Sequence, residues 1–183
     1  MIILASASPR RQALLDILNI EYKVCIPQAD ENLPDNISPR HAVELLAERK
    51  AGKVFYMYPQ EIVLAADTLV VKDGNILGKP KSEKDAFSML SMLSGSTHQV
   101  YTGVCVMSKT EKILFHEKTD VYFYPLNDDD IRSYICTGEP MDKAGAYGIQ
   151  GKGCLFVKSI KGDFYNVMGL PIARVARILQ QLK

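Results

Sequence analysis

The sequence predicts an α/β protein, in which buried strands alternate with helices. Two stretches carry this prediction. The first eighteen residues read as a strand-turn-helix unit, with an apolar run over Ile2–Ala5, a break at Ser6–Ser8 and a helix that begins at Pro9. Further along, Ile62–Val71 is apolar on both faces, which is typical of a central strand that is covered on each side.

Length and composition limit the classes of protein that the chain can belong to. The 183 residues suffice for a single domain over 1–183, with room for two lobes, and 47% of them are hydrophobic. The formal net charge of +1 gives no bulk attraction to nucleic acid or to a membrane surface. No apolar run approaches the ~20 residues of a membrane span, and no secretory leader is recognisable. We therefore expect a cytoplasmic protein.

The four cysteines support the same compartment. Cys25, Cys105, Cys136 and Cys154 are scattered, and no two of them stand at metal-ligand spacing. We expect them to be reduced thiols.

The start of the first helix is a candidate anion site. Ser8 is expected to cap this helix, and Arg10 and Arg11 occupy its first turn, where the helix dipole disfavours cations. Small hydroxyls, unpaired backbone N–H groups and two guanidinium groups together favour a bound phosphate. The alternative is a solvated, basic helix start, which we would prefer if only one arginine were present.

The next elements place two more candidates. A strand over Glu21–Ile26 is followed by a polar loop whose acids, Asp30 and Glu31, mean little by themselves. A helix then begins at Ser38-Pro39-Arg40, and Lys50 falls on its apolar stripe, seven residues after Val43. Such a lysine either extends past the edge of the core into solvent or faces a buried anion.

Asp67 lies in the middle of the predicted central strand. A carboxylate there is costly unless it is paired, hydrogen-bonded or bound to a metal, so we interpret Asp67 as a site residue. The following Asp73-Gly74 predicts a two-residue hairpin that pairs Val71 with Ile76. Extending this register brings Lys79 within one residue of Asp67.

The rest of the chain supplies one more distinctive stretch. Residues 138–153 contain five glycines, which allow the backbone to approach a ligand closely. Their spacing fits neither a Walker loop nor a dinucleotide fingerprint. The other expected elements are a helix from Ser82 to Leu93, strands over 98–107 and 113–124, a helix starting at Asn127, a strand over 154–160 and a helix over 171–182.

Six short motifs, in this order, resemble those of the Maf family of nucleoside triphosphate pyrophosphatases. They are Ser-Ala-Ser-Pro-Arg-Arg at 6–11, Ala-Asp-Thr at 66–68, Gly-Lys-Pro at 78–80, Tyr-Thr-Gly-Val at 101–104, Asp-Lys-Ala-Gly-Ala-Tyr-Gly-Ile-Gln-Gly at 142–151 and Gly-Leu-Pro at 169–171. The resemblance covers nearly the full length. It follows the branch that prefers dTTP and UTP, because the branch that acts on 7-methyl-GTP typically has Ser-Pro-Trp-Arg and Ser-Asp-Gln at the corresponding motifs.

The resemblance implies hydrolysis of a nucleoside triphosphate to the monophosphate and pyrophosphate, with a divalent cation such as Mg, Mn or Co. It implies that Asp67 is the proton acceptor and that Asp67 and Glu31 are the metal ligands. The remaining roles it implies are base selection by Arg10, Thr68 and Gln150, and phosphate binding by Arg11, Lys50 and Lys79, to which the helix-start argument adds Ser8.

The fold implied by the resemblance is the two-lobed architecture shared with inosine triphosphatases, on a long bent mixed sheet with the active site in the central cleft, commonly as a homodimer. Two other functions stay open: a 7-methyl-GTP pyrophosphatase, and a non-catalytic nucleotide-binding regulator of cell division. A nucleic-acid-binding module is disfavoured by the near-neutral charge and by the lack of a stripe of aromatic and basic residues. We expect neither nucleic acid nor a membrane as a partner.

Overall fold

The computed structural model describes residues 1–182 and contains a seven-stranded mixed sheet. The strands follow the order β2-β1-β3-β5-β6-β7, and β4 is attached to β3. Their bounds are β1 (Ile2–Leu4), β2 (Tyr22–Val24), β3 (Ile62–Lys72), β4 (Asn75–Leu77), β5 (Thr97–Met107), β6 (Lys112–Phe123) and β7 (Val157–Lys161). β1 is parallel to both β2 and β3, whereas β4 and β7 are antiparallel to their neighbours. The predicted α/β class is thus confirmed.

The chain divides into two compact units. Unit 1 is formed by Met1–Thr68, Thr102–Glu117 and Gly169–Lys183, and unit 2 by Leu69–Tyr101 and Lys118–Met168. The long strands β3, β5 and β6 each contribute residues to both units. The expectation of one domain stays a prediction.

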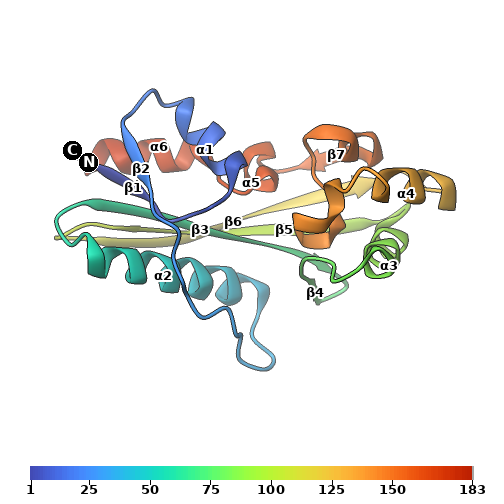
Figure 1. Cartoon of the computed structure of the whole chain (residues 1–183), viewed down its shortest axis with the longest axis horizontal. Coiled ribbons are helices and arrows are strands. Elements are labelled where there is room, and N and C mark those ends of the chain that lie inside the picture. The colour runs from blue at the N-terminus through green and yellow to red at the C-terminus, as the bar shows by residue number, and fades with distance from the viewer. Residues whose placement is uncertain (183) are drawn as a thin grey trace. The chain divides into compact units, whose positions relative to one another are not determined.

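In unit 1, helices cover the strands from both sides. The long helix α2 (Pro39–Met57) lies along one face, and α1 (Pro9–Asp16) and α6 (Ile172–Gln181) lie on the other (Figure 1). The stripe predicted for α2 is buried: Ala47, Ala51 and Val54 pack with Ile3 and Val63 of the sheet. This packing fixes the face of α2 that also carries Lys50.

A glycine allows α2 to lie directly on β5. A Cβ atom added at Gly103 would meet the carbonyl oxygen of Val43 at 2.2 Å, a distance that no side chain tolerates. Because the contact involves the backbone of α2, the helix has no room to relax around a larger residue. Gly103 therefore sets the height of α2 above the sheet.

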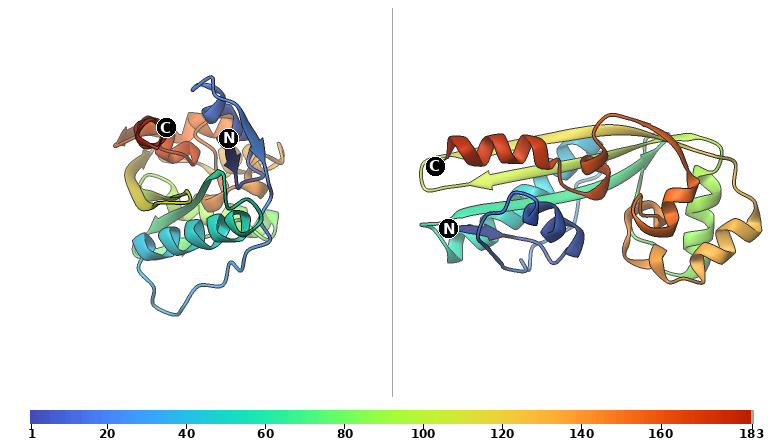
Figure 2. Two further views of the ribbon diagram at one scale, coloured as in Figure 1. Left: turned by 90° about the vertical axis from the view of Figure 1, so that its left-hand side faces the viewer. Right: turned by 90° about the horizontal axis from the view of Figure 1, so that it is seen from above.

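Unit 2 is built around an aromatic core. Helices α3 (Glu83–Leu93) and α4 (Asp128–Ile135) pack together beside the short 3₁₀ turns over Glu139–Asp142, Ala144–Ala146 and Gly151–Phe156, as Figure 2 shows, and α5 (Phe164–Met168) completes the unit. Asn127 caps α4 in a reciprocal capping box with Asp130. The three acidic residues in the first turn of α4, Asp128, Asp129 and Asp130, therefore suit the start of a helix.

Several predicted boundaries are wrong. The strand expected over 154–160 starts only at Val157, since Gly151–Phe156 forms a 3₁₀ turn that begins at Gly151 with φ +74°. The strand expected over 21–26 is only β2, and α5 was not predicted. Within residues 1–182, no helix has both the length and the apolar composition needed to span a membrane.

Candidate active site

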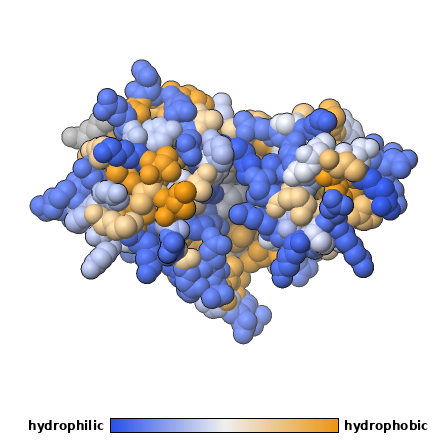
Figure 3. All heavy atoms as spheres, in the orientation of Figure 1, coloured by the Kyte–Doolittle hydropathy of each residue, from blue (hydrophilic) through white to orange (hydrophobic). Residues whose placement is uncertain are grey.

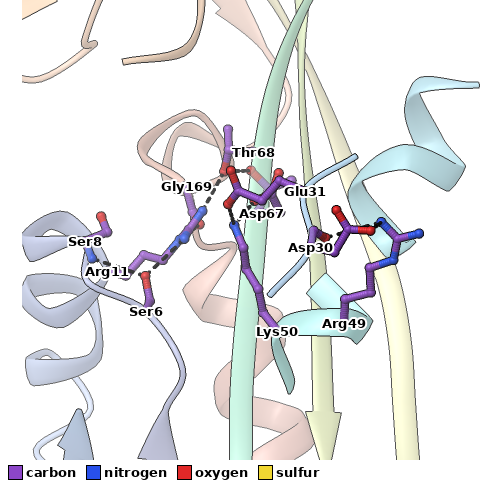
Figure 4. A network of polar contacts seen from close by, with 11 residues as sticks. Ser6, Ser8, Arg11, Asp30, Glu31, Arg49, Lys50, Asp67, Thr68 and Gly169 are labelled. Atoms are coloured by element: carbon purple, nitrogen blue, oxygen red, sulfur yellow. Dashed lines mark hydrogen bonds and ion pairs between the residues drawn. The ribbon is translucent and has the colours of Figure 1, made fainter. Parts of the chain in front are cut away.

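Asp67, Lys50 and Glu31 form the centre of the candidate site, and all three belong to unit 1 (Figure 4). The ammonium nitrogen of Lys50 donates to Asp67 Oδ1 at 2.5 Å and lies 2.8 Å from Glu31 Oε1. The side chains of Lys50 and Asp67 are only 16% and 13% exposed, whereas that of Glu31 is 69% exposed. Of the two alternatives for Lys50, the structure therefore shows the one in which it faces a buried anion.

The electrostatics of this group keep Lys50 charged. Burial by itself lowers the pKa of the Lys50 ammonium, but the carboxylates of Asp67 and Glu31 outweigh burial, so the pKa is raised above its ordinary value. The pairing also explains how β3 tolerates a carboxylate at its centre, because Asp67 is half-buried and compensated.

Arg11 joins three segments that are distant in sequence. Its guanidinium donates from Nε to the carbonyl oxygen of Gly169 at 2.8 Å, from Nη1 to Ser6 Oγ at 3.1 Å and from Nη2 to Thr68 Oγ1 at 3.1 Å. Burial lowers the pKa of Arg11, and the nearby charge of Asp67 opposes this. Arg11 is thus bonded to Thr68, the residue after Asp67, and three of its donors already have protein partners.

The helix start differs from its prediction in one detail. Ser8 is the residue that precedes α1, but its side chain makes no capping hydrogen bond. Instead the backbone N–H of Ser8 donates to Ser6 Oγ at 3.2 Å, so Ser6 organises this turn. Arg10 is half-buried at the first turn of α1.

The loop that carries Glu31 is held from α2. Arg49 donates from Nη1 to the carbonyl oxygens of Asp30 and Asn32, at 3.3 and 2.6 Å, one on each side of Glu31. Lys50, the next residue of the helix, contacts the Glu31 side chain itself. Two consecutive residues of α2 therefore fix the backbone and the carboxylate of the same loop position.

The predicted residues Lys79 and Gln150 belong to unit 2. The hairpin is confirmed, because Val71 pairs with Ile76 and the turn residues Asp73 and Gly74 have φ of 49° and 80°. β4 ends at Leu77, however, so the strand pairing does not extend to Lys79. Lys79 and Gln150 are both exposed, and their roles stay predictions.

The described residues offer few metal ligands. Among residues 1–182, no group of three or more His, Cys, Asp or Glu side chains is arranged to hold a metal ion. Two carboxylates, those of Asp67 and Glu31, converge on a single cation, the Lys50 ammonium. This donor set fits an ion such as Mg²⁺, which takes one or two carboxylates and completes its shell with water and substrate phosphates.

Three partners in the site were not predicted as such. Ser6 and Gly169 bind Arg11, and Thr102 Oγ1 lies 2.9 Å from Thr68 Oγ1. All three fall within quoted motifs: Ser6 in Ser-Ala-Ser-Pro-Arg-Arg, Gly169 in Gly-Leu-Pro and Thr102 in Tyr-Thr-Gly-Val. No sequence pattern indicates the role of Arg49, since arginines on a helix surface are common.

Comparisons with known proteins show what the whole chain is similar to. Residues 1–182 match the family model described as "Maf-like protein". A protein of Geobacillus sp. (strain WCH70) named dTTP/UTP pyrophosphatase is 52% identical over 181 residues, covering 99% of this chain and 97% of the relative. One of the same name from Bacillus velezensis is 51% identical over 180 residues, covering 98% and 95%.

Among solved structures, the Ham1 protein of Staphylococcus aureus superposes with a TM-score of 0.54 at 15% identity, covering 100% of this chain and 99% of that one. At this identity the likeness shows the fold alone.

Proposed function

Because the chain belongs to the Maf family, we propose that it is a nucleoside triphosphate pyrophosphatase that hydrolyses dTTP and UTP to the monophosphate and pyrophosphate. The observation that carries the proposal is Asp67: a carboxylate at the centre of a buried strand, paired with Lys50 and close to the charge of Arg11. The names of the relatives support the reaction and the choice of pyrimidine nucleotide.

The proposed chemistry is attack of water on the α-phosphorus. Asp67 accepts the proton of the water as the new P–O bond forms, and the bond to the α–β bridging oxygen breaks so that pyrophosphate leaves. Lys50 binds Oδ1 of Asp67, so we assign the proton transfer to Oδ2. The cations Lys50, Arg11 and Lys79 stabilise the negative charge that develops on the phosphates, and Ser8 adds a hydroxyl.

A divalent cation is part of the proposal. Asp67 and Glu31 would hold it, because their carboxylates converge on one cation, the Lys50 ammonium. When bound, such an ion neutralises phosphate charge and polarises the phosphoryl oxygens.

Base choice is proposed to rest on Gln150, Thr68 and Arg10. Thymine and uracil present a carbonyl–imide–carbonyl edge, and the amide of Gln150 can both donate and accept a hydrogen bond. Thr68 follows Asp67 directly in β3 and so couples base recognition to the carboxylate. A site that relies on such bonds rejects the wrong edge strongly, because its own polar groups would stay unpaired.

Release of pyrophosphate across a panel of dTTP, UTP, dCTP, dATP, dGTP and 7-methyl-GTP tests the function. We expect dTTP and UTP to be hydrolysed well above the others. Asp67→Asn should lower turnover by about 10²- to 10⁴-fold while nucleotide still binds. Asp73→Asn is the matched control, because Asp73 is exposed in the hairpin turn, where asparagine tolerates the positive φ.

Three outcomes would overturn the proposal or part of it. A purine nucleotide or 7-methyl-GTP as the best substrate would support the other branch of the family. Unchanged turnover of Asp67→Asn would show that Asp67 is not the base. Binding without hydrolysis of any nucleotide would support a non-catalytic regulator.

A homodimer in the cytoplasm is also proposed. All four cysteines are unpaired thiols, which supports a reducing compartment. Unit 1 exposes large apolar side chains, among them Ile17, Val24 and Ile26, and Figure 3 shows an apolar area over the region of β1 and β2. Light scattering coupled to gel filtration measures the mass directly, and a monomer at all concentrations would contradict this part.

A further inference from the structure

His98 is a buried polar residue of unit 2 that the proposed chemistry does not use. It lies on β5, is fully buried, and its Nε2 is 2.7 Å from the hydroxyl oxygen of Tyr147. Its ring also meets Phe123 edge-on, at 4.8 Å between centroids. Nδ1 has no hydrogen-bond partner among the described residues. An imidazole in an apolar core is costly, so packing alone would be served better by phenylalanine or leucine.

The partner of His98 belongs to the glycine-rich stretch that carries Gln150. Tyr147 is buried and packs edge-on against both His98 and Phe123. Ile149 is buried as well, whereas Gln150 is exposed. The stretch is therefore still buried at Ile149 and reaches the surface at the next residue, the proposed base-selecting Gln150.

The residues on either side of Tyr147 are also fixed. Gly145 has φ +68°, and a Cβ added there would lie 2.9 Å from a methyl group of Val70. Its N–H donates to the carbonyl oxygen of Gly78 at 3.0 Å, which ties the stretch to the residue before Lys79. Past Tyr147, the hydroxyl of Tyr134 accepts from the N–H of Gly148 at 3.1 Å.

The same segment holds a strained residue. Ala146 is buried with φ +59°, a conformation that costs a non-glycine residue free energy of folding and persists only where its surroundings enforce it. The bond from His98 to Tyr147, the next residue, supplies such a constraint from the sheet. Backbone geometry that is this closely determined is what a hydrogen-bonding site for one base edge requires.

We propose that His98 is a positioning residue: by binding the hydroxyl of Tyr147 it fixes the backbone from which Gln150 selects the base. This inference rests on the proposed function, because it requires Gln150 to contact the base. His98 itself touches no substrate. Its loss changes discrimination between bases without removing any group that takes part in hydrolysis.

Tyr147→Phe is the sharpest test, since it deletes one oxygen atom and keeps the ring that packs on Phe123. The measured quantity is the ratio of kcat/KM for dTTP to that for dCTP, determined on one preparation, because the fraction of folded enzyme cancels in this ratio. We expect Tyr147→Phe to lower the ratio about 5- to 20-fold. The change should be mainly a higher KM for dTTP at nearly unchanged kcat.

Three further variants and one matched control complete the design. His98→Phe should lower the ratio as much as Tyr147→Phe does. The double variant should lower it no further, because both single variants remove the same hydrogen bond. His98→Gln, which keeps a hydrogen-bonding group, should retain part of the ratio. The matched control is Thr119→Val, since Thr119 is fully buried in unit 2 but bonds to Asn166 and Asp163 and not to the glycine-rich stretch.

The outcomes separate this inference from the function on which it rests. If Gln150→Ala lowers the ratio and Tyr147→Phe leaves it within about twofold, the positioning role is refuted and the base assignment stands. If Gln150→Ala itself leaves the ratio unchanged, the base assignment fails. A drop in Thr119→Val equal to that in Tyr147→Phe would mean that any loosening of unit 2 has this effect, and would also refute the role.

Discussion

The pair between Lys50 and Asp67 allows a quantitative prediction about where the free energy of the site lies. Lys50 contacts two carboxylates at similar distances, 2.5 Å for Asp67 and 2.8 Å for Glu31, but only Asp67 is shielded from water. A charge-assisted hydrogen bond in a shielded place contributes about 1.5–3 kcal/mol. An exposed ion pair contributes about 0.2–1 kcal/mol, because solvent screens it.

Double-mutant cycles measure these two couplings separately. The variants are Lys50→Met, Asp67→Asn and Glu31→Gln, with the two doubles that contain Lys50→Met. We expect a coupling of about 1.5–3 kcal/mol between Lys50 and Asp67 in the free energy of unfolding by urea at pH 7. The coupling between Lys50 and Glu31 should be below about 1 kcal/mol.

An exposed pair between Glu48 of α2 and Lys112 of β6 serves as the control. Lys112 and Glu48 are 2.6 Å apart, as close as Lys50 and Asp67, but both are far more exposed. Their coupling should be near the limit of measurement, which would show that burial and not distance decides the magnitude. A Lys50–Glu31 coupling as large as that of Lys50–Asp67 would refute the reasoning.

Three further predictions follow from the packing and burial described above. Arg11→Lys should lower the free energy of unfolding by about 2–4 kcal/mol, since an ammonium cannot serve three fixed acceptors; an unchanged urea midpoint would contradict this. Gly103→Ala should cost about 3 kcal/mol, because its Cβ would overlap the Val43 carbonyl, whereas Gly52→Ala on α2 has free space and should stabilise slightly. Burial lowers the pKa of His98 to about 4, and the charge of a nearby lysine adds to this, so the folded state favours the neutral ring. The stability that this ring provides is complete above pH 6.5 and is lost as the pH falls toward 4, by about 2 kcal/mol between pH 7 and 5. Urea titrations at several pH values should show that the free energy of unfolding falls less between pH 7 and 5 in His98→Phe than in the unmodified protein. Equal losses in the two proteins would disprove the assignment of this pH dependence to His98.

Local signals predicted the elements that carry the site. The long apolar run of β3 and the periodic apolar stripe of α2 are both too long for a turn or loop, and Asp67 was conspicuous because it breaks the run of β3. The Asp73-Gly74 turn fixed the hairpin register through its positive φ angles. These are short-range effects, so a single sequence reveals them.

Long-range partners could not be predicted in the same way. Whether Lys50 met an anion or water depended on β3, seventeen residues away, and the alternatives stayed open until the structure placed Asp67 beside it. The last three residues of the 3₁₀ turn, 154–156, were predicted as strand because their apolar side chains fit either state. The close approach of Gly153 to Gly148, which leaves no room for a Cβ atom, has no sequence pattern of its own. Arg49 donates its hydrogen bonds to backbone carbonyls, which every residue offers, and its ion pair with the exposed Asp30 carboxylate is 3.7 Å long.

The Arg11 contacts also bear on how the site arises during synthesis. Arg11 and Gly169 are 158 residues apart, so at about 5–20 residues per second the ribosome makes the second partner roughly 8–30 s after the first. Until then the guanidinium beside Thr68 lacks its acceptor in the C-terminal segment, and α1 has one anchor fewer. A nascent chain that stops short of Gly169 can form the hairpin of β3 and β4 from local contacts, but it cannot complete the group around Arg11. The candidate site is therefore among the last parts of the molecule to form.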